Sequence, residues 1–232
     1  MKLLLISSST VHGSGYLDHC AEEIRNFLGQ LERILFVPFA LKDREAYTAR
    51  AAERLGQMGY AVDGLHRERD PQGAVARAEA IFVGGGNTFR LLDALYRQDL
   101  LQPIRERVLA GAPYVGSSAG SNVACVTIKT TNDMPIVYPP SLDALNLVPF
   151  NINPHYLDPN PDSTHMGETR DTRIREFHEE NDPAVVGLRE EAMLRIEGPR
   201  VMLKGTRGAR VFVKGEEPRE LPPGARLDFL LA

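Results

Sequence analysis

The chain has 232 residues, of which 43% are hydrophobic and 25% charged, a composition typical of globular proteins. Its formal net charge is −4 at pH 7, which gives no electrostatic case for binding nucleic acid or an anionic membrane. We therefore expect neither nucleic acid nor a membrane among its partners. The length suits one large α/β domain, and we expect a single domain over residues 1–232.

The two cysteines and the N-terminal segment bear on the cellular compartment. Cys20 and Cys125 lie far apart in apolar surroundings, which predicts two small buried side chains rather than a disulfide or a zinc site. The apolar run 3–6 is shorter than the core of a signal peptide, and a first buried strand explains it better. Because no other run approaches membrane-spanning length, we expect a cytoplasmic protein.

Short apolar runs alternate with longer amphipathic ones over the first 125 residues. This pattern predicts strands and helices in turn. The expected strands are 2–6, 34–39, 60–62, 80–83 and 114–115. The expected helices are 17–28, 44–58, 71–78 and 88–109, the last broken near Pro103. Apolar strands separated by helices predict an α/β fold, with a mostly parallel sheet covered by helices on both faces. In such sheets, ligands bind at the carboxyl ends of the strands.

The composition and the hydrophobic pattern of the chain change after residue 126. A stretch rich in proline and asparagine, 131–162, precedes an expected helix at 167–180. Strand-like pieces then follow, separated by turn residues, at 185–188, 193–196, 201–204 and 210–213. We expect these C-terminal strands to form antiparallel hairpins at one edge of the sheet. Such an edge leaves a homodimer open as an oligomeric state.

A Gly-x-Ser-x-Gly turn follows the apolar run that ends at Val115. It places Ser118 between Gly116 and Gly120. A turn of this kind between strand and helix lifts a serine hydroxyl above the end of a sheet, where a base and a substrate both reach it. Ser118 is therefore the candidate nucleophile. The alternative is a serine that caps the helix beginning there.

A second glycine turn, Gly84-Gly85-Gly86, follows the strand that ends at Val83 and opens a helix. Unhindered backbone N–H groups at a helix start bind negative charge, such as a phosphate or a developing oxyanion. The dinucleotide-binding pattern is incomplete, because Phe89 stands where its third glycine belongs. An oxyanion role requires this turn to lie beside Ser118, with the N–H of Ala119 as second donor. A simple tight turn is the alternative.

Six histidines compete for the role of general base. His155 and His165 are the leading candidates, since the other four lie in expected loops or solvated helix faces: His12, His19, His66 and His178. No ligand spacing supports a metal site built from His155 and His165. Arg170 offers a guanidinium suited to a carboxylate, although a solvated helix face that pairs with nearby acidic residues is the usual explanation.

Several stretches, taken in order, resemble the peptidase E family, the aspartyl dipeptidases among serine peptidases. The resemblance covers nearly the whole chain and rests on the following runs: Pro38-Phe39-Ala40, Val83-Gly84-Gly85-Gly86-Asn87-Thr88-Phe89, Gly116-x-Ser118-Ala119-Gly120, 130–137, Ile152-Asn153-Pro154-His155 and Gly167-Glu168-Thr169-Arg170. It implies a fold like that of the class I glutamine amidotransferases. It also implies hydrolysis of dipeptides and short peptides that begin with aspartate, without a cofactor or a metal.

The resemblance also assigns roles to residues. It implies Ser118 as nucleophile, His155 as general base and Glu190 as the acid of a catalytic triad. The oxyanion donors are expected among the N–H groups of Gly85, Gly86 and Ala119. Arg170 matches the arginine expected to hold the aspartyl carboxylate. Three residues of the matching motifs are expected to line the substrate site: Asn87, Thr88 and Asp133.

Two departures from the family pattern leave alternatives open. Ser117 stands where the family often has tryptophan. The usual Pro-Glu-Gly around the acid is Arg189-Glu190-Glu191 here, so Glu191 and Asp133 compete with Glu190 for that role. The alternative functions are a cyanophycinase-like β-aspartyl peptidase, an α/β-hydrolase esterase that uses Asp133, and a non-enzymatic module that binds a small anion.

Overall fold

The computed structural model describes residues 1–159, 162, 164 and 166–231. A seven-stranded sheet has the order β3-β2-β4-β5-β1-β8-β9. Its first five members are parallel neighbours, and β8 and β9 are antiparallel. The strand bounds are β1 Lys2–Ile6, β2 Arg33–Val37, β3 Ala61–Gly64, β4 Ala80–Val83, β5 Tyr114–Ser117, β8 Ala192–Glu197 and β9 Arg200–Gly205. The predicted α/β class and mostly parallel sheet are confirmed.

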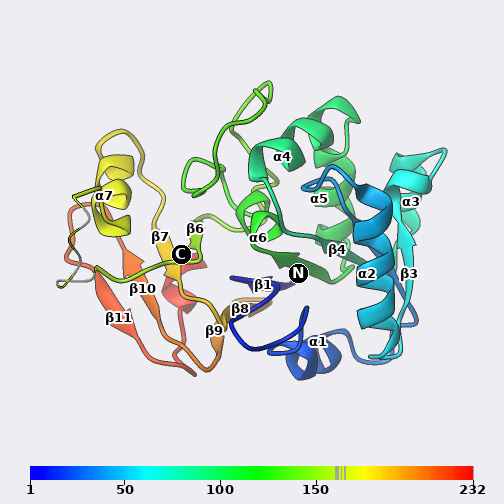
Figure 1. Cartoon of the computed structure of the whole chain (residues 1–232), viewed down its shortest axis with the longest axis horizontal. Coiled ribbons are helices and arrows are strands. Elements are labelled where there is room, and N and C mark those ends of the chain that lie inside the picture. Colours follow the sequence, from blue (N-terminus) through cyan, green and yellow to red (C-terminus); the bar gives the residue numbers. More distant parts are fainter. Residues whose placement is uncertain (160–161, 163, 165, 232) are drawn as a thin grey trace.

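Helices cover both faces of this sheet (Figure 1). One face packs on α1 Ala21–Leu28 and α2 Arg44–Gly56 through one apolar cluster. The opposite face packs on four other helices through a second cluster. Those helices are α3 Pro71–Arg77, α4 Thr88–Arg97, α5 Leu101–Leu109 and the short α6 Ala119–Val123. The apolar strands are therefore buried on both sides, as expected of parallel strands.

The long helix predicted at 88–109 is two helices, as expected. The break lies at residues 98–100, just before the predicted point at Pro103, because proline is tolerated in the first turn of a helix. Asn87 caps α4 by accepting a hydrogen bond from the N–H of Arg90 at 3.0 Å. The start of α4 is thus fixed directly behind the glycine turn.

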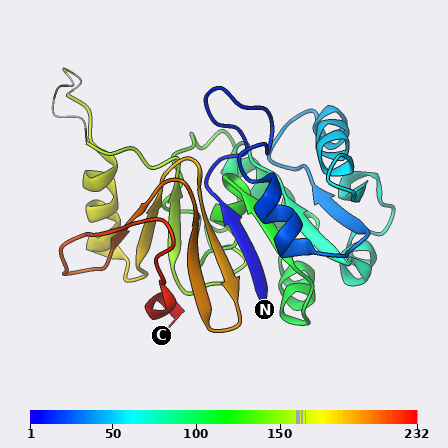
Figure 2. The same ribbon diagram turned by 90° about the horizontal axis from the view of Figure 1, so that it is seen from below.

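A second, four-stranded sheet has the order β11-β10-β7-β6. Its strands are β6 Asn151–Pro154, β7 Val185–Leu188, β10 Ala209–Phe212 and β11 Arg219–Leu221. With α7 Arg170–Glu180 it gathers at one end of the molecule, as Figure 2 shows from below. Of the expected C-terminal hairpins, only β8–β9 extends the large sheet. The placement of β7 and β10 at that edge is wrong, because the parallel pairing of β6 with β7 draws them into a sheet of their own.

The large apolar cluster contains residues of both sheets, including Leu3 of β1 and Val186 of β7. The two sheets therefore share one apolar core. The segment 2–6, interpreted above as a strand, is β1 and lies between β5 and β8. Both cysteines are buried as expected, and burial raises the pKa of each thiol to about 12. No helix within the described ranges is long and apolar enough to cross a membrane.

Candidate active site

Ser118 stands at the turn between β5 and α6. Its backbone has φ +51° and ψ −108°, a conformation that is strained for a residue with a side chain. The strain is held because the Ser118 N–H donates to the carbonyl of Ile6 at 2.9 Å. On the inner side of the turn there is no room for side chains, since a Cβ on Gly120 would lie 2.1 Å from the carbonyl oxygen of Val83. The local sequence therefore forces the serine outward.

His155 and Glu190 come from the ends of two paired strands of the smaller sheet. β6 and β7 are parallel, with Pro154 opposite Leu188, so the residues that follow them emerge side by side. His155 Nε2 lies 2.9 Å from Ser118 Oγ, and His155 Nδ1 lies 3.0 Å from Glu190 Oε1. The structure thus joins the three predicted triad residues in one chain of hydrogen bonds.

The other two candidates for the acid are engaged elsewhere. Glu191 has φ +64° and its carboxylate accepts a hydrogen bond from the hydroxyl of Thr206. Asp133 Oδ2 accepts from the N–H and the hydroxyl of Thr88, at 2.7 and 2.6 Å. Of the three, only Glu190 contacts the His155 ring. An esterase triad of Ser118, Asp133 and His155 would need Asp133 to contact the His155 ring, and Asp133 contacts Thr88 instead.

The glycine turn lies against the serine, as the oxyanion hypothesis requires. A Cβ on Gly85 would sit 3.1 Å from the Cβ of Ser118. Within the described ranges, the N–H groups of Gly86 and Ala119 donate to no protein acceptor. Burial raises the Tyr47 pKa, and the Gly85 backbone is among the contacts that oppose the rise. The N–H groups of Gly86 and Ala119 are therefore available to donate to an anion.

The predicted substrate-binding residues Asn87, Thr88 and Asp133 connect the glycine turn to the segment that follows α6. Besides the Thr88–Asp133 contacts, the side-chain amide of Asn87 donates to the carbonyl of Met134 at 2.9 Å. The side-chain amide of Asn132, which precedes Asp133, donates to the carbonyl of Pro154 at 2.6 Å. Pro154 immediately precedes His155. Segment 131–134 therefore contacts both the residue before His155 and the residues that follow the glycine turn.

Arg170 is the first residue of α7 and is half-buried. Burial lowers the pKa of its guanidinium, and the nearby Arg173 lowers it further. The acidic neighbours have other partners: Glu168 pairs with Arg173 at 3.5 Å, and Asp171 pairs with Arg210 at 3.1 Å. Among the residues the structure describes, none forms a hydrogen bond or ion pair with the guanidinium of Arg170. A partly desolvated cation without an acid partner is suited to bind an anionic group.

One functional contact escaped the sequence analysis. The Ser7 hydroxyl, fully buried at the end of β1, donates to the carbonyl of Leu188 at 2.8 Å. It also accepts from the N–H of His155 at 2.9 Å. Ser7 thereby ties the large sheet to both strands that carry the base and the acid. The available signal was a polar residue directly after a buried strand, at the carboxyl edge of the sheet.

Of the remaining histidines, His19 lies within electrostatic reach of Glu190: burial lowers its pKa, and the charges of Glu191 and Glu190 oppose that shift. His66 pairs with Glu45, and His178 bonds to the carbonyl of Pro183. His165 lies outside the described residues. A search of the described ranges finds no group of His, Cys, Asp and Glu side chains that could hold a metal ion.

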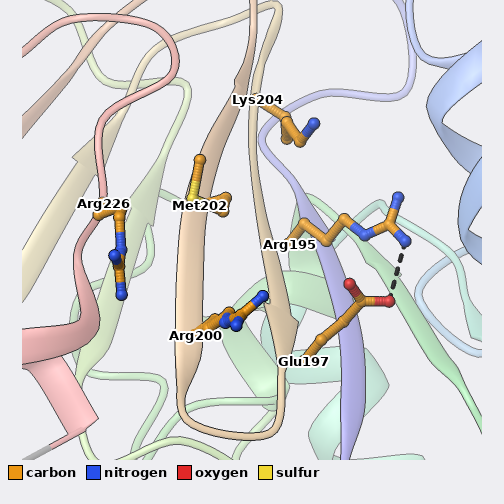
Figure 3. Close-up of a pocket in the computed structure, with 6 residues that line it drawn as sticks. All are labelled: Arg195, Glu197, Arg200, Met202, Lys204 and Arg226. Carbon is orange, nitrogen blue, oxygen red and sulfur yellow. Dashed lines mark hydrogen bonds and ion pairs between the residues drawn. The ribbon is translucent and has the colours of Figure 1, made fainter.

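A separate recess of about 300 Å³ lies on the β8–β9 hairpin (Figure 3). It contains none of the predicted site residues and is mostly basic. Its lining is Arg195, Glu197, Arg200, Met202, Lys204 and Arg226. Arg195 is held there by Glu197 at 2.9 Å and by Glu23 of α1 at 2.8 Å. This recess is therefore distinct from the site around Ser118.

The α/β sheet with a serine at a strand–helix turn, a histidine and a carboxylate in hydrogen-bond contact defines the class of serine hydrolases. The model of peptidase family S51 matches residues 3–204. The chain belongs to this family, and the predicted resemblance is confirmed.

Relatives match over the full length of the chain. It is 54% identical to Peptidase E of Streptomyces coelicolor, covering 100% of this chain and 95% of the relative. It is 52% identical to a Drosophila melanogaster protein named "Probable alpha-aspartyl dipeptidase", covering 99% and 97%. A crystal structure of a peptidase from an acI-B1 Actinobacterium shares the fold, with a TM-score of 0.74 at 20% identity over 97% of this chain and 96% of that one.

Proposed function

We propose that the chain is a serine dipeptidase that releases aspartate from the N-terminus of dipeptides and short peptides, through an acyl-enzyme on Ser118. The observation that carries the proposal is the continuous hydrogen-bonded chain from Ser118 through His155 to Glu190. Membership of a peptidase family supports the reaction class. The name of the fruit-fly relative supports the aspartyl preference and the α-linkage.

In this mechanism His155 Nε2 accepts the proton of Ser118 as its oxygen attacks the carbonyl carbon of the N-terminal aspartate. Glu190 accepts from Nδ1, which fixes the tautomer and stabilises the imidazolium. The N–H groups of Gly86 and Ala119 stabilise the oxyanion, with Gly85 holding the turn against the serine. The imidazolium then protonates the leaving amine. Water, deprotonated by the same histidine, hydrolyses the ester that remains.

Arg170 gives the proposed specificity. A half-buried guanidinium pairs with the aspartyl carboxylate, and binding a neutral asparagine would leave it desolvated without a partner. Glutamate has one more methylene, which shifts its carbonyl relative to Ser118. In this proposal Asn87, Thr88 and Asp133 line the site on the side of the oxyanion turn. The proposal places this reaction in the cytoplasm.

The first experiment measures aspartate released from Asp-Leu, beside Asn-Leu, Glu-Leu and β-Asp-Leu, by the wild-type chain and by Ser118→Ala. We expect turnover of Asp-Leu only, and its loss in the variant. Turnover of β-Asp-Leu instead would favour the cyanophycinase-like alternative. No turnover, with no labelling of Ser118 by a serine-directed phosphonate, would favour the anion-binding module.

The acid is tested with two neighbouring glutamates. Glu190→Gln keeps the shape of the side chain but removes the charge, and we expect kcat to fall by about 10²–10⁴-fold. Glu191→Gln is the matched control and should retain nearly full activity, because Glu191 contacts Thr206 and not His155. Equal losses in the two variants would contradict the assignment.

A further inference from the structure

A network of ion pairs lies behind the base and the acid, on the smaller sheet. Arg189 precedes Glu190, and its side chain is only 18% exposed. Its Nε donates to Asp158 at 2.9 Å, and its Nη2 donates to Glu220 at 3.0 Å. The guanidinium also lies over the ring of Tyr156, 5.5 Å from the centroid. Arg189 therefore holds the segment that directly follows His155.

The same network reaches the beginning of α7. Glu220 contacts Arg210 at 3.5 Å, and Arg210 pairs with Asp171 at 3.1 Å. Asp171, whose side chain is 14% exposed, also accepts a hydrogen bond from the hydroxyl of Tyr156. Asp171 is thus held by two groups of the smaller sheet and its flanking segment.

Two sequence neighbours make this arrangement relevant to the reaction. Tyr156 follows His155, and Asp171 follows Arg170. The contact between the Tyr156 hydroxyl and Asp171 therefore links the residue after His155 to the residue after Arg170. Since the guanidinium of Arg170 has no partner among the described residues, its position depends on what holds the first turn of α7.

We propose that Arg189 and Arg210, acting through Asp171 and Tyr156, are positioning residues that fix Arg170 relative to the His155–Glu190 pair and thereby determine the preference for an N-terminal aspartate. This inference rests on the proposed function. Neither arginine contacts the substrate. A displacement of about 1 Å in a positioning group can cost about 100-fold in rate. A less firmly held α7 should therefore lower the ratio of kcat/KM between Asp-Leu and Asn-Leu.

The test compares Arg210→Met with the wild-type chain on Asp-Leu and Asn-Leu. We expect KM for Asp-Leu to rise and kcat/KM to fall roughly 10- to 100-fold, while the already slow reaction of Asn-Leu changes little. The ratio between the two substrates should fall accordingly. The rate at which a serine-directed phosphonate labels Ser118 should stay unchanged, because the triad is intact. Arg210→Lys, which keeps the charge, should restore part of the ratio.

Two further variants keep the test decisive if Arg210→Met folds poorly. Tyr156→Phe removes only the hydroxyl that contacts Asp171 and should lower the same ratio by a smaller factor. Arg195→Met is the matched control, because Arg195 is 20% exposed and forms ion pairs with Glu197 of β8 (Figure 3) and with Glu23 of α1. It should leave the ratio unchanged.

Three outcomes would overturn the inference. An unchanged ratio in Arg210→Met and Tyr156→Phe would mean that the network does not position Arg170. A parallel loss of Ser118 labelling would mean that it supports the triad instead. An equal loss in Arg195→Met would mean that any buried ion pair has this effect. A wild-type chain that cleaves none of the dipeptides would instead overturn the proposed function, and this inference with it.

Discussion

The seven-stranded sheet supplies Ser118 and the glycine turn, whereas the four-stranded sheet supplies His155 and Glu190. In the large sheet, position is fixed by the absence of side chains: a Cβ on Gly116, Gly120 or Gly85 would meet neighbouring backbone at 3.0 Å or less. In the small sheet and its flanking segments, position is fixed by polar contacts, such as those of Arg189.

This difference has a physical origin. The oxyanion donors are backbone N–H groups, so their geometry is set by how closely two chain segments approach. The base, the acid and the proposed specificity residue are side chains, whose rotamers must be locked by neighbours. A backbone position that is fixed by close packing does not depend on pH, but it tolerates no larger side chain. A side chain that is held by ion pairs tolerates substitution of its partners, but its position depends on pH. The predictions below test this contrast.

The largest effect should come from removing either end of the Ser118–His155 contact. Ser118→Ala and His155→Ala should each lower kcat for Asp-Leu by at least about 10⁴-fold. Because the two residues act as one unit, the double variant should be no slower than either single variant. Losses that multiply would show that the two sheets contribute independently. Steady-state kinetics with thermal unfolding as a folding control makes this comparison.

Steric fixing is tested by Gly120→Ala. The new Cβ would meet the carbonyl oxygen of Val83 at 2.1 Å, so we expect the free energy of unfolding to fall by about 1–3 kcal/mol or more, as in overpacked cores. Gly56→Ala in α2, where nothing lies within 4 Å of a new Cβ, is the control and should be neutral or stabilising. Urea denaturation measures both. Equal stability of the two variants would argue against the steric account.

Ser7→Ala tests the contact that joins the two sheets. The substitution leaves the partly buried N–H of His155 without its acceptor, which should cost about 1 kcal/mol of stability. It should also lower kcat, since the base is less firmly held. The control is Ser14→Ala, whose hydroxyl contacts only the nearby carbonyls of Val11 and Gly15. A full-activity Ser7→Ala chain would show that the β6–β7 pairing alone positions His155.

The smallest effect concerns pH. Hydrogen bonding by Arg189 lowers the pKa of Asp158 in the folded chain. The pair therefore contributes stability above the ordinary carboxyl pKa, and this contribution disappears as the pH falls through the lowered value. Asp158→Asn should slightly flatten the acid side of the stability profile and leave stability near pH 7 only slightly reduced, because Asp158 is 53% exposed. Urea denaturation between acid and neutral pH measures this, with Asp182→Asn, paired to the distant Lys214, for comparison.

The sequence by itself determined most of the elements and predicted the candidate nucleophile. Apolar runs separated by amphipathic helices predicted the strands β1 to β5 and their parallel pairing. Burial on both faces of a sheet demands such continuous apolar strands. Both glycine turns were predicted from the sequence, and the structure shows that close backbone approach excludes side chains at Gly85, Gly116 and Gly120. Ser118 was predicted from its glycine turn, whereas the roles of His155, Glu190 and Arg170 were implied by the resemblance to a known family.

Only the tertiary structure decided how these parts meet. The Ser7 bridge joins residues that are 181 positions apart, and the contacts of Arg189 with Asp158 and Glu220 join residues that are 31 positions apart. Local pattern cannot reveal such pairings, because a short apolar strand fits the edge of one sheet as well as the centre of another. Likewise, Glu190 and Glu191 are equivalent as neighbours in the chain, and the turn after β7 directs only one of them to His155.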